Sequence, residues 1–517
     1  MYKLLLCLRY LRTRYIALAS IISVMLGVAT MIVVNAVMSG FAREMENRIH
    51  GILSDVVLET RSLSGELDDQ RHKEAILEVA GDAVEAMTTT VVVPAMLSFR
   101  YGDNWINRQV QLIGIDEDTV CGVSDFAKYL QHPENRRQPS FLLHERGYDV
   151  RDPLGGEEAP LRPQMASAGW EHRRRMAQWR ALEERLKQAE AGRTGAAPAP
   201  AGTAPQGPVP YDPFAQHRPD ESAQFDPARQ QHPGAILGLI LATYRTPGSA
   251  EDHFLLLPGD DVTLTFPNAP QGEPPKIISR NFTVVDFYQC KMSEYDSSVV
   301  FVPMRTLQEL RGMIDPASGL ARFNSIQIKL KPGQDGQRVR DRLRGAFDPR
   351  FYVIQTWRDK QGPLLAAVQM ETAILNVLLF LIIAVSGFGI LAIFFMIVVE
   401  KTRDIGILKS LGASAWGVMW IFLGYGLSLG LVGSGVGMVL GLQVAWHIND
   451  VADWLGRLTG KPVFDPSVYY FYRIPALVNP WTVAWIVLGA VGIAVLASVL
   501  PALRAAMLRP VESLRYE

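Results

Sequence analysis

Cysteine is scarce in this chain of 517 residues, which contains only Cys7, Cys121 and Cys290. Their spacing matches neither a zinc site nor a redox pair, so the cysteines indicate neither kind of chemistry. A disulfide between Cys121 and Cys290 requires that their region lie outside the cell, where such bonds persist. The alternative is two isolated thiols, and the sequence leaves both open.

Several functional motifs are also missing. The chain has no G-x-x-x-x-G-K-[ST] phosphate-binding loop and no H-E-x-x-H metal-binding helix. A formal net charge of -1 argues against a nucleic-acid partner, because such proteins usually carry a basic face. We therefore predict a non-catalytic chain that binds no cofactor, no metal and no nucleic acid.

Charge is absent from long stretches near the C-terminal end. Residues 372–399 and 410–449 contain no Asp, Glu, Lys or Arg. Ionisable residues inside membrane helices usually mark ion or proton pathways, so their absence argues against a secondary transporter or a channel. Any energy for transport must then come from another protein.

Long apolar runs are present, and a helix crosses a bilayer in about 20 apolar residues. The first run is far longer than the apolar core of a signal peptide, so we predict that it is an uncleaved span. The predicted fold is an α-helical membrane protein with a large α+β domain between its first and second spans. The four predicted membrane helices are residues 15–41, 372–399, 414–447 and 480–503.

Lysine and arginine beside these runs set the predicted orientation, because cytoplasmic loops carry an excess of both. The basic residues cluster before the first run, between the second and third, and after the fourth. This pattern predicts a cytoplasmic N-terminus (1–14), inner segment (400–413) and C-terminus (504–517). It places the large region 42–371 and the loop 448–479 on the outer side.

The third run is rich in glycine. Small residues recur every four positions in two series, and such faces allow another helix to approach closely. The alternative is that a membrane helix merely tolerates glycine. The two series are Gly426, Gly430 and Ser434, and Gly433, Gly437 and Gly441.

The outer region contains short runs of β-branched residues with helical stretches between them, which is typical of a mixed α+β sheet. The predicted helices are 70–80 and 337–346. The predicted strands are 55–59, 88–93, 110–115, 261–266, 281–287, 298–303, 325–330 and 352–356.

Residues 131–233 have a different composition. Within them, 170–193 is rich in Arg, Glu and Ala and is predicted to form an exposed helix, and 194–210 is dense in Ala, Pro and Gly. Such a composition buries too little apolar surface to offset the entropy of ordering. We predict a low-complexity, disordered or loosely helical insertion, with a partner-binding arm as the alternative.

The inner segment reads as a short amphipathic helix. Asp404, Ile407, Leu408 and Leu411 share one stripe, which Ile405 widens, and Gly406 and Gly412 permit a close approach or a turn. A short helix of this kind can dock into a groove on a partner. The residues alone leave open an ordinary surface loop. The residues that we assign to docking are Glu400, Lys401, Arg403, Asp404, Ile405, Ile407, Leu408, Lys409, Leu411 and Gly412.

The segment EKTRDIGILKSLGAS at 400–414 resembles the coupling segment of ABC permeases of the FtsX/MacB type. The C-terminal PALRAA at 501–506 and RPVESLR at 509–515 are similar to the ending of that superfamily. YDSSVVFVP at 295–303 and WRDKQGPLLAAVQME at 357–371 resemble the Lol lipoprotein-releasing permeases of the LolC/LolE type. LIGID at 112–116 and PGAILG at 233–238 resemble their outer domain. The insertion at 131–233 departs from that family.

The resemblance implies a permease of the bacterial inner membrane that releases lipoproteins. It implies a separate ATPase subunit that binds ATP and Mg²⁺, a second permease copy or paralogue, and a periplasmic lipoprotein carrier. The lipid anchor would meet apolar residues at the outer ends of the first two spans, although these side chains equally suit contact with membrane lipids or packing. They are Val34, Val37, Met38, Phe41, Met370, Ile374 and Leu378.

Two other functions remain open. One is a MacB-like exporter of peptides or small molecules, although that branch usually fuses its ATPase to the permease and we see none before Tyr15. The other is an FtsX-like regulator of a cell-wall hydrolase, although the outer region here is much larger than in that branch.

Overall fold

The computed structural model describes residues 15–52, 54–62, 64–102, 104–155, 159, 161–193, 225–245, 252–269, 274–459 and 473–509. The chain divides into two units. The helical unit comprises Met1–Glu46, Gly362–Asp465 and Arg473–Glu517, and the sheet unit contains Asn47–Gln361.

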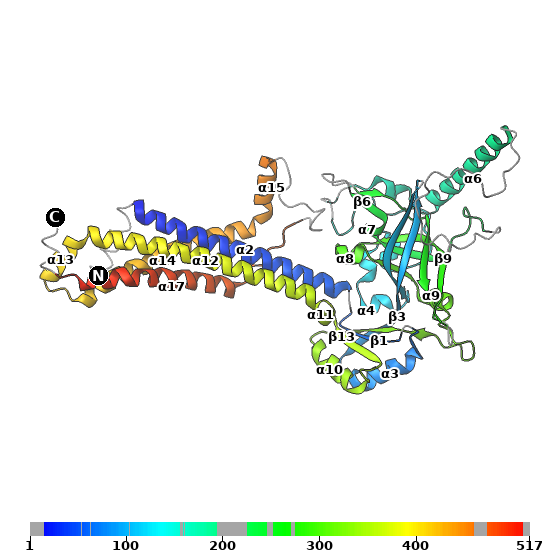
Figure 1. Ribbon diagram of the computed structural model, residues 1–517, viewed down its shortest axis with the longest axis horizontal. Helices are drawn as coiled ribbons and strands as arrows, with labels where there is room; N and C mark the ends of the chain where they lie inside the picture. The colour runs from blue at the N-terminus through cyan, green and yellow to red at the C-terminus, as the bar shows by residue number, and fades with distance from the viewer. Residues whose placement is uncertain are drawn as a thin grey trace. The chain divides into compact units, whose positions relative to one another are not determined.

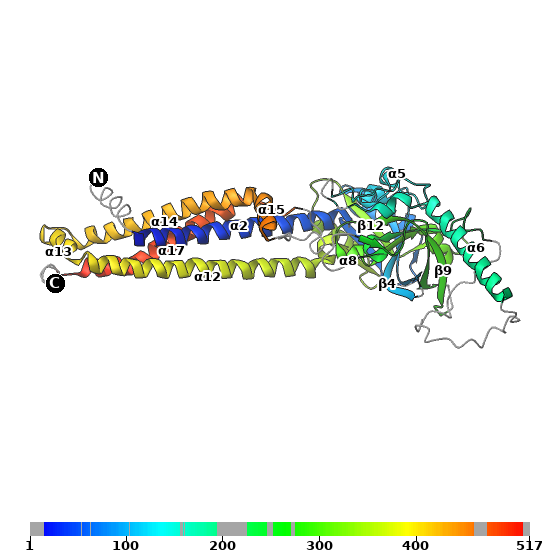
Figure 2. The ribbon, with the colours of Figure 1, turned by 90° about the horizontal axis from the view of Figure 1, so that it is seen from above.

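Four long helices form the helical unit and run side by side in both views (Figures 1 and 2). Each is long and apolar enough to cross a membrane, which confirms the prediction of four such helices. The first two extend beyond their predicted spans. The helices are α2 (Tyr15–Ile52), α12 (Gly362–Glu400), α14 (Ala415–Trp446) and α17 (Pro480–Met507).

The glycines of α14 face two different neighbours. A Cβ atom on Gly430 would lie 2.9 Å from the Cβ of Ala494 on α17, and one on Gly426 would lie 2.5 Å from the Oγ of Ser498 on the same helix. On the other stripe, a Cβ on Gly437 would lie 2.6 Å from the carbonyl oxygen of Met25 on α2. Gly433 and Gly441 also face α2. Both neighbours therefore approach α14 at distances that a side chain would prevent.

A further helix, α15 (Ile448–Thr459), follows α14 in the segment that we predicted only as a loop. Its apolar residues recur at helical spacing, and none of its residues, all of which the structure describes, is buried. The exposed apolar residues are Val451, Trp454, Leu455 and Leu458. An unburied apolar face of this kind is typical of a helix lying in a membrane interface.

The sheet unit is built around a nine-stranded sheet. Its strands are β1 (Val56–Thr60), β3 (Val84–Tyr101), β4 (Asn104–Ile115), β5 (Gly234–Gly238), β8 (Asp261–Pro267), β9 (Ile277–Tyr288), β10 (Val299–Pro303), β12 (Ser325–Leu330) and β13 (Tyr352–Thr356). Shorter strands pair outside it: β2 (Glu66–Leu67) with β11 (Arg322–Phe323), and β6 (Thr243–Arg245) with β7 (Asp252–Phe254).

The long strand β3 joins two parts of the sheet. Its first half pairs with β12, which continues through β1 to β13. Its second half pairs with both β4 and β8, so that β3, β4, β10, β5, β9 and β8 close into a ring. The β4–β10 and β5–β9 pairs are parallel and the others antiparallel, which confirms the predicted mixed sheet.

Two apolar cores fill this unit. One lies within the closed ring and includes Leu97, Leu112 and Phe282. The other lies between the remaining strands and two helices, α3 (Asp69–Ala80) and α10 (Gly336–Ala346). Short helices complete the unit: α4 (Val120–Val123), α5 (Pro133–Arg137), α7 (Leu239–Ala242), α8 (Ser293–Asp296), α9 (Met304–Arg311) and α11 (Trp357–Lys360).

The predicted disorder of 131–233 is wrong for its first part. The described residues between Gln131 and Arg173 pack on the sheet, and several of their buried polar groups form hydrogen bonds with it. Arg162 donates to Asp252 at 2.9 Å, with both side chains almost fully buried. Arg173 donates to Asp261 at 2.7 Å. A polar composition predicts disorder, because the sequence alone does not show that these charged side chains pair in the interior of the fold.

The rest of that segment comprises α6, residues 194–224 outside the described part, and residues 225–233, where the N–H of His232 donates to the hydroxyl of Thr283 on β9. Helix α6 (Trp170–Arg193) has the predicted bounds and extends away from the sheet (Figure 1). Trp179 and Leu186 on its later turns are exposed. The Ala/Pro/Gly-rich stretch 194–210 lies outside the described residues. Cys121 is exposed and Cys290 is buried, and both are free thiols.

The glycine contacts generate a prediction about stability. We expect Gly437→Ala to lower the thermal unfolding temperature of the detergent-solubilised protein, because its Cβ would lie 2.6 Å from the Met25 carbonyl. Overpacking of this kind costs about 1–3 kcal/mol. Fluorescence-detected size exclusion after heating measures the change.

Gly435→Ala provides the matched control on the same helix, since a Cβ atom at Gly435 would have no neighbouring element of the described residues within 4 Å. We expect this variant to be neutral or slightly stabilised, because alanine favours helix by up to about 1 kcal/mol over glycine. Equal unfolding temperatures for both variants would contradict the packing argument.

Candidate functional site

The inner segment folds as α13 (Thr402–Ser410), a short helix between α12 and α14. It lies at the end of the helical unit where α12 stops and α14 begins (Figure 1). Gly412 follows it with φ 96°, a left-handed conformation that favours glycine. Ser414 then caps α14 by accepting a hydrogen bond from the backbone N–H of Gly417. These residues turn the chain sharply between α13 and α14.

One side of α13 is attached to the helix bundle. Ile405 is only 3% exposed and belongs to the apolar core of the four long helices. Lys409 donates from its ammonium group to the carbonyl oxygens of Ala506 at 2.7 Å and Leu508 at 2.6 Å. These carbonyls lie at the C-terminal end of α17, where free carbonyl groups attract a cation. Lys409 therefore ties α13 to α17.

The other side of α13 faces solvent. Ile407 is 43% exposed and Leu411 is 80% exposed, with Arg403 and Asp404 beside them. We call these four residues the exposed face of α13. Leu408 is half-buried at its edge, and Glu400 and Gly412 are exposed at the flanking turns.

This arrangement corrects two details of the sequence prediction. Ile405 was placed on the apolar docking stripe and Lys409 among the docking charges, but both contact the bundle. Lys401 forms an ion pair with Asp404 at 3.0 Å on the surface, and such exposed pairs contribute at most about 1 kcal/mol. The exposed face thus combines apolar and charged side chains on a helix whose opposite side is bound to the bundle.

The residues predicted to meet a lipid anchor lie at one end of the α2–α12 pair. Ser23 donates to Ser386 at 2.9 Å, and Gly27 faces Ile383, so the two helices are antiparallel in close contact. Continuing that register along the helices places Val37 on α2 opposite residues Met370–Ile374 on α12.

Their exposure differs between the two helices. The α2 residues Val34, Val37, Met38 and Phe41 are half-buried. Met370, Ile374 and Leu378 are exposed, at 66%, 50% and 51%. A separate small hollow lies between other residues of α2 and the start of α17, and includes Asn35, Ser39 and Asn479. The predicted set is therefore an apolar surface at one end of the helix pair, distinct from this more polar hollow.

The two motifs that resemble lipoprotein-releasing permeases meet in the sheet unit. Gln361, from the second motif, donates to the hydroxyl of Tyr295 in the first at 2.8 Å. Asp359 completes the capping box of α11 by accepting the backbone N–H of the N-cap residue Thr356, and it accepts two hydrogen bonds from Arg340. These contacts thus hold the last residues of the sheet unit, up to Gln361, in place. The sequence of the motifs alone does not show this role.

Asp296 organises the turn before the first motif. Its carboxylate accepts hydrogen bonds from the backbone N–H groups of Cys290 and Lys291, both at 2.9 Å, and from the Cys290 thiol at 3.1 Å. Lys291 has φ 63°, which is unusual for a residue with a side chain. Burial raises the pKa of Asp296 to about 7, although these hydrogen bonds lower it.

Comparison with known proteins supports the resemblance. Residues 376–510, which include α13, match the family described as FtsX-like permease C-terminal. The lipoprotein-releasing system transmembrane protein LolC of Neisseria meningitidis is 29% identical over 262 residues, which cover 50% of this chain and 61% of LolC. LolE of Haemophilus influenzae is 30% identical over 166 residues, covering 32% and 40%.

A more distant relative has a different function in its name. The macrolide export ATP-binding/permease protein MacB of Bdellovibrio bacteriovorus is 25% identical over 265 residues, which cover 48% of this chain and 36% of MacB. The chain spans less than two thirds of the length of each of these relatives. The comparisons confirm the predicted similarity to the FtsX/MacB superfamily and to LolC and LolE.

Asp296 gives a prediction about pH. Its pKa is raised from 3.8 to about 7 in the folded protein, so the folded state holds a proton that the unfolded state has lost between these values. Stability from this group is therefore present below 3.8 and is lost as the pH rises through about 7. We expect wild type to gain stability over Asp296→Asn as the pH falls through this window, measured by thermal unfolding.

Asp315→Asn is the control of opposite sign. The pKa of Asp315 is lowered, chiefly by the hydrogen bond from Ser318, so wild type should lose its advantage over this variant on acidification. A difference between wild type and Asp296→Asn that does not change with pH would refute the assignment of a raised pKa to Asp296.

Proposed function

We propose that this chain is the permease subunit of an ATP-driven ABC transporter that releases lipoproteins from the bacterial inner membrane. The observation that carries the proposal is the exposed face of α13. This helix lies between two apolar helices, within residues 376–510 that match the FtsX-like permease family. The names of the LolC and LolE relatives supply the substrate class.

In this proposal a separate ATPase docks on α13. ATP and Mg²⁺ belong to that subunit, since this chain has no phosphate-binding loop. Ile407 and Leu411 supply the apolar contact, and Arg403 and Asp404 the charges that select the partner. Because Ile405 and Lys409 tie α13 to the bundle, a displacement of the docked helix moves α12, α14 and α17.

ATP hydrolysis by a separate subunit supplies the energy that release of a lipid-anchored protein requires. Withdrawing an acyl chain from a bilayer costs about 0.8 kcal/mol for each methylene group, so a lipid anchor does not leave spontaneously. The apolar ends of α2 and α12, around Val37 and Ile374, would receive such chains at the outer side of the membrane. From there the lipoprotein would pass to a periplasmic carrier on its way to the outer membrane.

The proposed assembly contains a second permease copy or paralogue, paired with two ATPase subunits. The chain would lie in the inner membrane with both termini cytoplasmic, as the distribution of Lys and Arg predicts. The region between α2 and α12 would then be periplasmic. An alternative is a MacB-like exporter of peptides or small molecules, which the similarity to MacB favours.

The docking proposal predicts the effect of charge on α13. We expect Leu411→Glu and Ile407→Glu each to reduce co-purification of the ATPase by ~10-fold or more, because a charge inside an apolar interface costs about 2 kcal/mol or more. Both side chains are exposed in this chain, so the unfolding temperature should stay unchanged. Affinity purification of the tagged permease followed by quantification of the ATPase measures the effect.

Met507→Glu is the matched control, since Met507 is 77% exposed at the end of α17 and lies outside the exposed face of α13. It should retain the ATPase. Full retention of the ATPase by Leu411→Glu and Ile407→Glu would exclude this face as the docking site.

The transport proposal predicts the location of lipoproteins in cells. We expect depletion of this chain to leave outer-membrane lipoproteins in the inner-membrane fraction, as measured by fractionation and immunoblotting. Wild type and Met507→Glu should restore their release, and Leu411→Glu should not. Normal sorting after depletion, accompanied by loss of peptide or drug efflux, would reject lipoprotein release in favour of the MacB-like function.

A further inference from the structure

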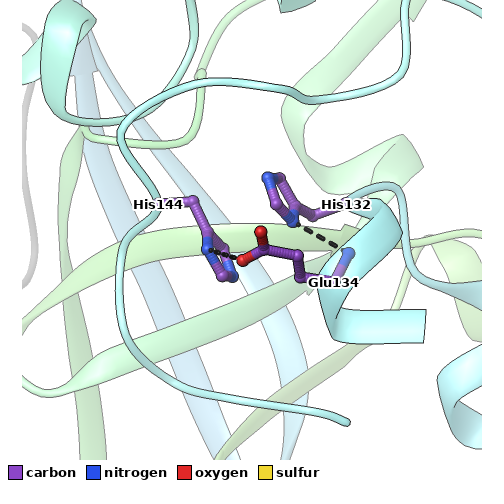
Figure 3. Close-up of side chains that lie close together, drawn as sticks. All are labelled: His132, Glu134 and His144. Atoms are coloured by element: carbon purple, nitrogen blue, oxygen red, sulfur yellow. Dashed lines mark hydrogen bonds and ion pairs between the residues drawn. The ribbon is translucent and has the colours of Figure 1, made fainter. Parts of the chain in front are cut away.

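Two histidines and a glutamate come together in the folded first part of the predicted insertion. His132 and Glu134 lie at the start of α5, and His144 lies in the irregular segment that follows it. One ligand atom from each residue lies within 4.8 Å of the others. Figure 3 shows the Glu134 carboxylate beside the His144 ring, with His132 on the adjacent turn. None of these residues takes part in the proposed transport.

Hydrogen bonds define which nitrogen of each ring carries a proton. The Nδ1 of His132 accepts the backbone N–H of Glu134 at 3.2 Å, so its Nε2–H donates to the Arg146 carbonyl at 3.2 Å. The Nε2 of His144 lies 2.9 Å from the side-chain oxygen of Asn135. That oxygen is an acceptor because the Asn135 amide nitrogen donates to Asp286 at 2.7 Å.

Nδ1 of each ring therefore lies on the side of Glu134, and the lone pair of His132 Nδ1 accepts the Glu134 N–H. For His144, Nδ1 lies 3.1 Å from a carboxylate oxygen of Glu134. That contact requires positive charge between the two atoms, which either a proton on the ring or a bound metal ion supplies. The partners of the two Nε2–H groups are a backbone carbonyl and a buried Asn–Asp pair, as in metal sites, where such groups orient the ligating imidazoles.

We propose that His132, Glu134 and His144 form a binding site for a borderline divalent transition-metal ion such as Zn²⁺. Two imidazole nitrogens and one carboxylate oxygen are a ligand set that Zn²⁺ accepts, with water completing the coordination. Glu134 is 73% exposed, so the ion enters from solvent. Hard cations such as Mg²⁺ prefer oxygen ligands and do not suit this site.

Binding requires two changes: the Glu134 N–H must release Nδ1 of His132, and the two rings must leave their stack. The two rings are stacked with centroids 3.8 Å apart and planes only 2° from parallel, whereas a bound ion lies near both ring planes. One ring must therefore tilt out of the stack. His132 is almost fully buried, so His144, which lies outside any helix or strand, makes this movement. The bound ion then cross-links α5 to the segment that follows it, independently of the proposed function.

The test uses the full-length protein, purified without a histidine tag, stripped with a chelator and titrated with Zn²⁺ alone. We expect one equivalent of Zn²⁺ to bind in the wild type in excess of that in a Glu134→Gln/His144→Phe variant. The affinity should fall by ~10-fold or more in each single variant, since even loss of an outer partner of a metal ligand costs 10–100-fold. Phenylalanine at 144 keeps a ring against His132, and the unfolding temperature without metal checks folding.

Glu145→Gln is the control, because Glu145 is a neighbouring exposed acid that pairs with Arg174. It should bind Zn²⁺ like the wild type, and Zn²⁺ should raise the unfolding temperature of both. Equal Zn²⁺ stoichiometry and affinity in the wild type and the double variant would overturn the proposal, as would loss of the site in Glu145→Gln.

Discussion

The close approach of α14 to α2 and α17 is the contact on which the helical unit depends. Membrane helices gain no hydrophobic free energy by packing together, so they associate through van der Waals contact between closely spaced backbones. Gly430 and Gly437 supply that contact on two faces of one helix. Because α14 begins directly after α13, a displacement of α13 is passed to a helix that packs closely against two neighbours.

The two sides of α13 have different roles. The side that holds Ile405 and Lys409 is attached to the bundle, and it supplies stiffness. The side that holds Ile407 and Leu411 contributes little to the stability of this chain, because these side chains remain in solvent. Exposed apolar residues on a rigid helix cost solubility, and their placement beside Arg403 and Asp404 is typical of a surface that recognises a partner.

Much of the fold could be predicted because its patterns are local. The four apolar helices follow from length and lack of charge, and the strands of the sheet from β-branched residues. The strand β5 was missed because Gly234–Gly238 has no alternation, being buried on both faces between β9 and β10. The sequence predicted the site only as one face of a helix. It wrongly placed Ile405 on that exposed face, because contacts with helices distant in sequence decide which side of a helix is buried.

Residues 131–173 show why composition misleads. Arg162 and Arg173 each lose their hydration on burial, which is tolerable only because Asp252 and Asp261 lie at hydrogen-bonding distance. Removing one partner would leave a buried charge, so these pairs fix one position of an irregular segment on the sheet. Arg173 lies in the first turn of α6. That helix is therefore anchored at its start while its exposed turns extend away from the sheet (Figure 1).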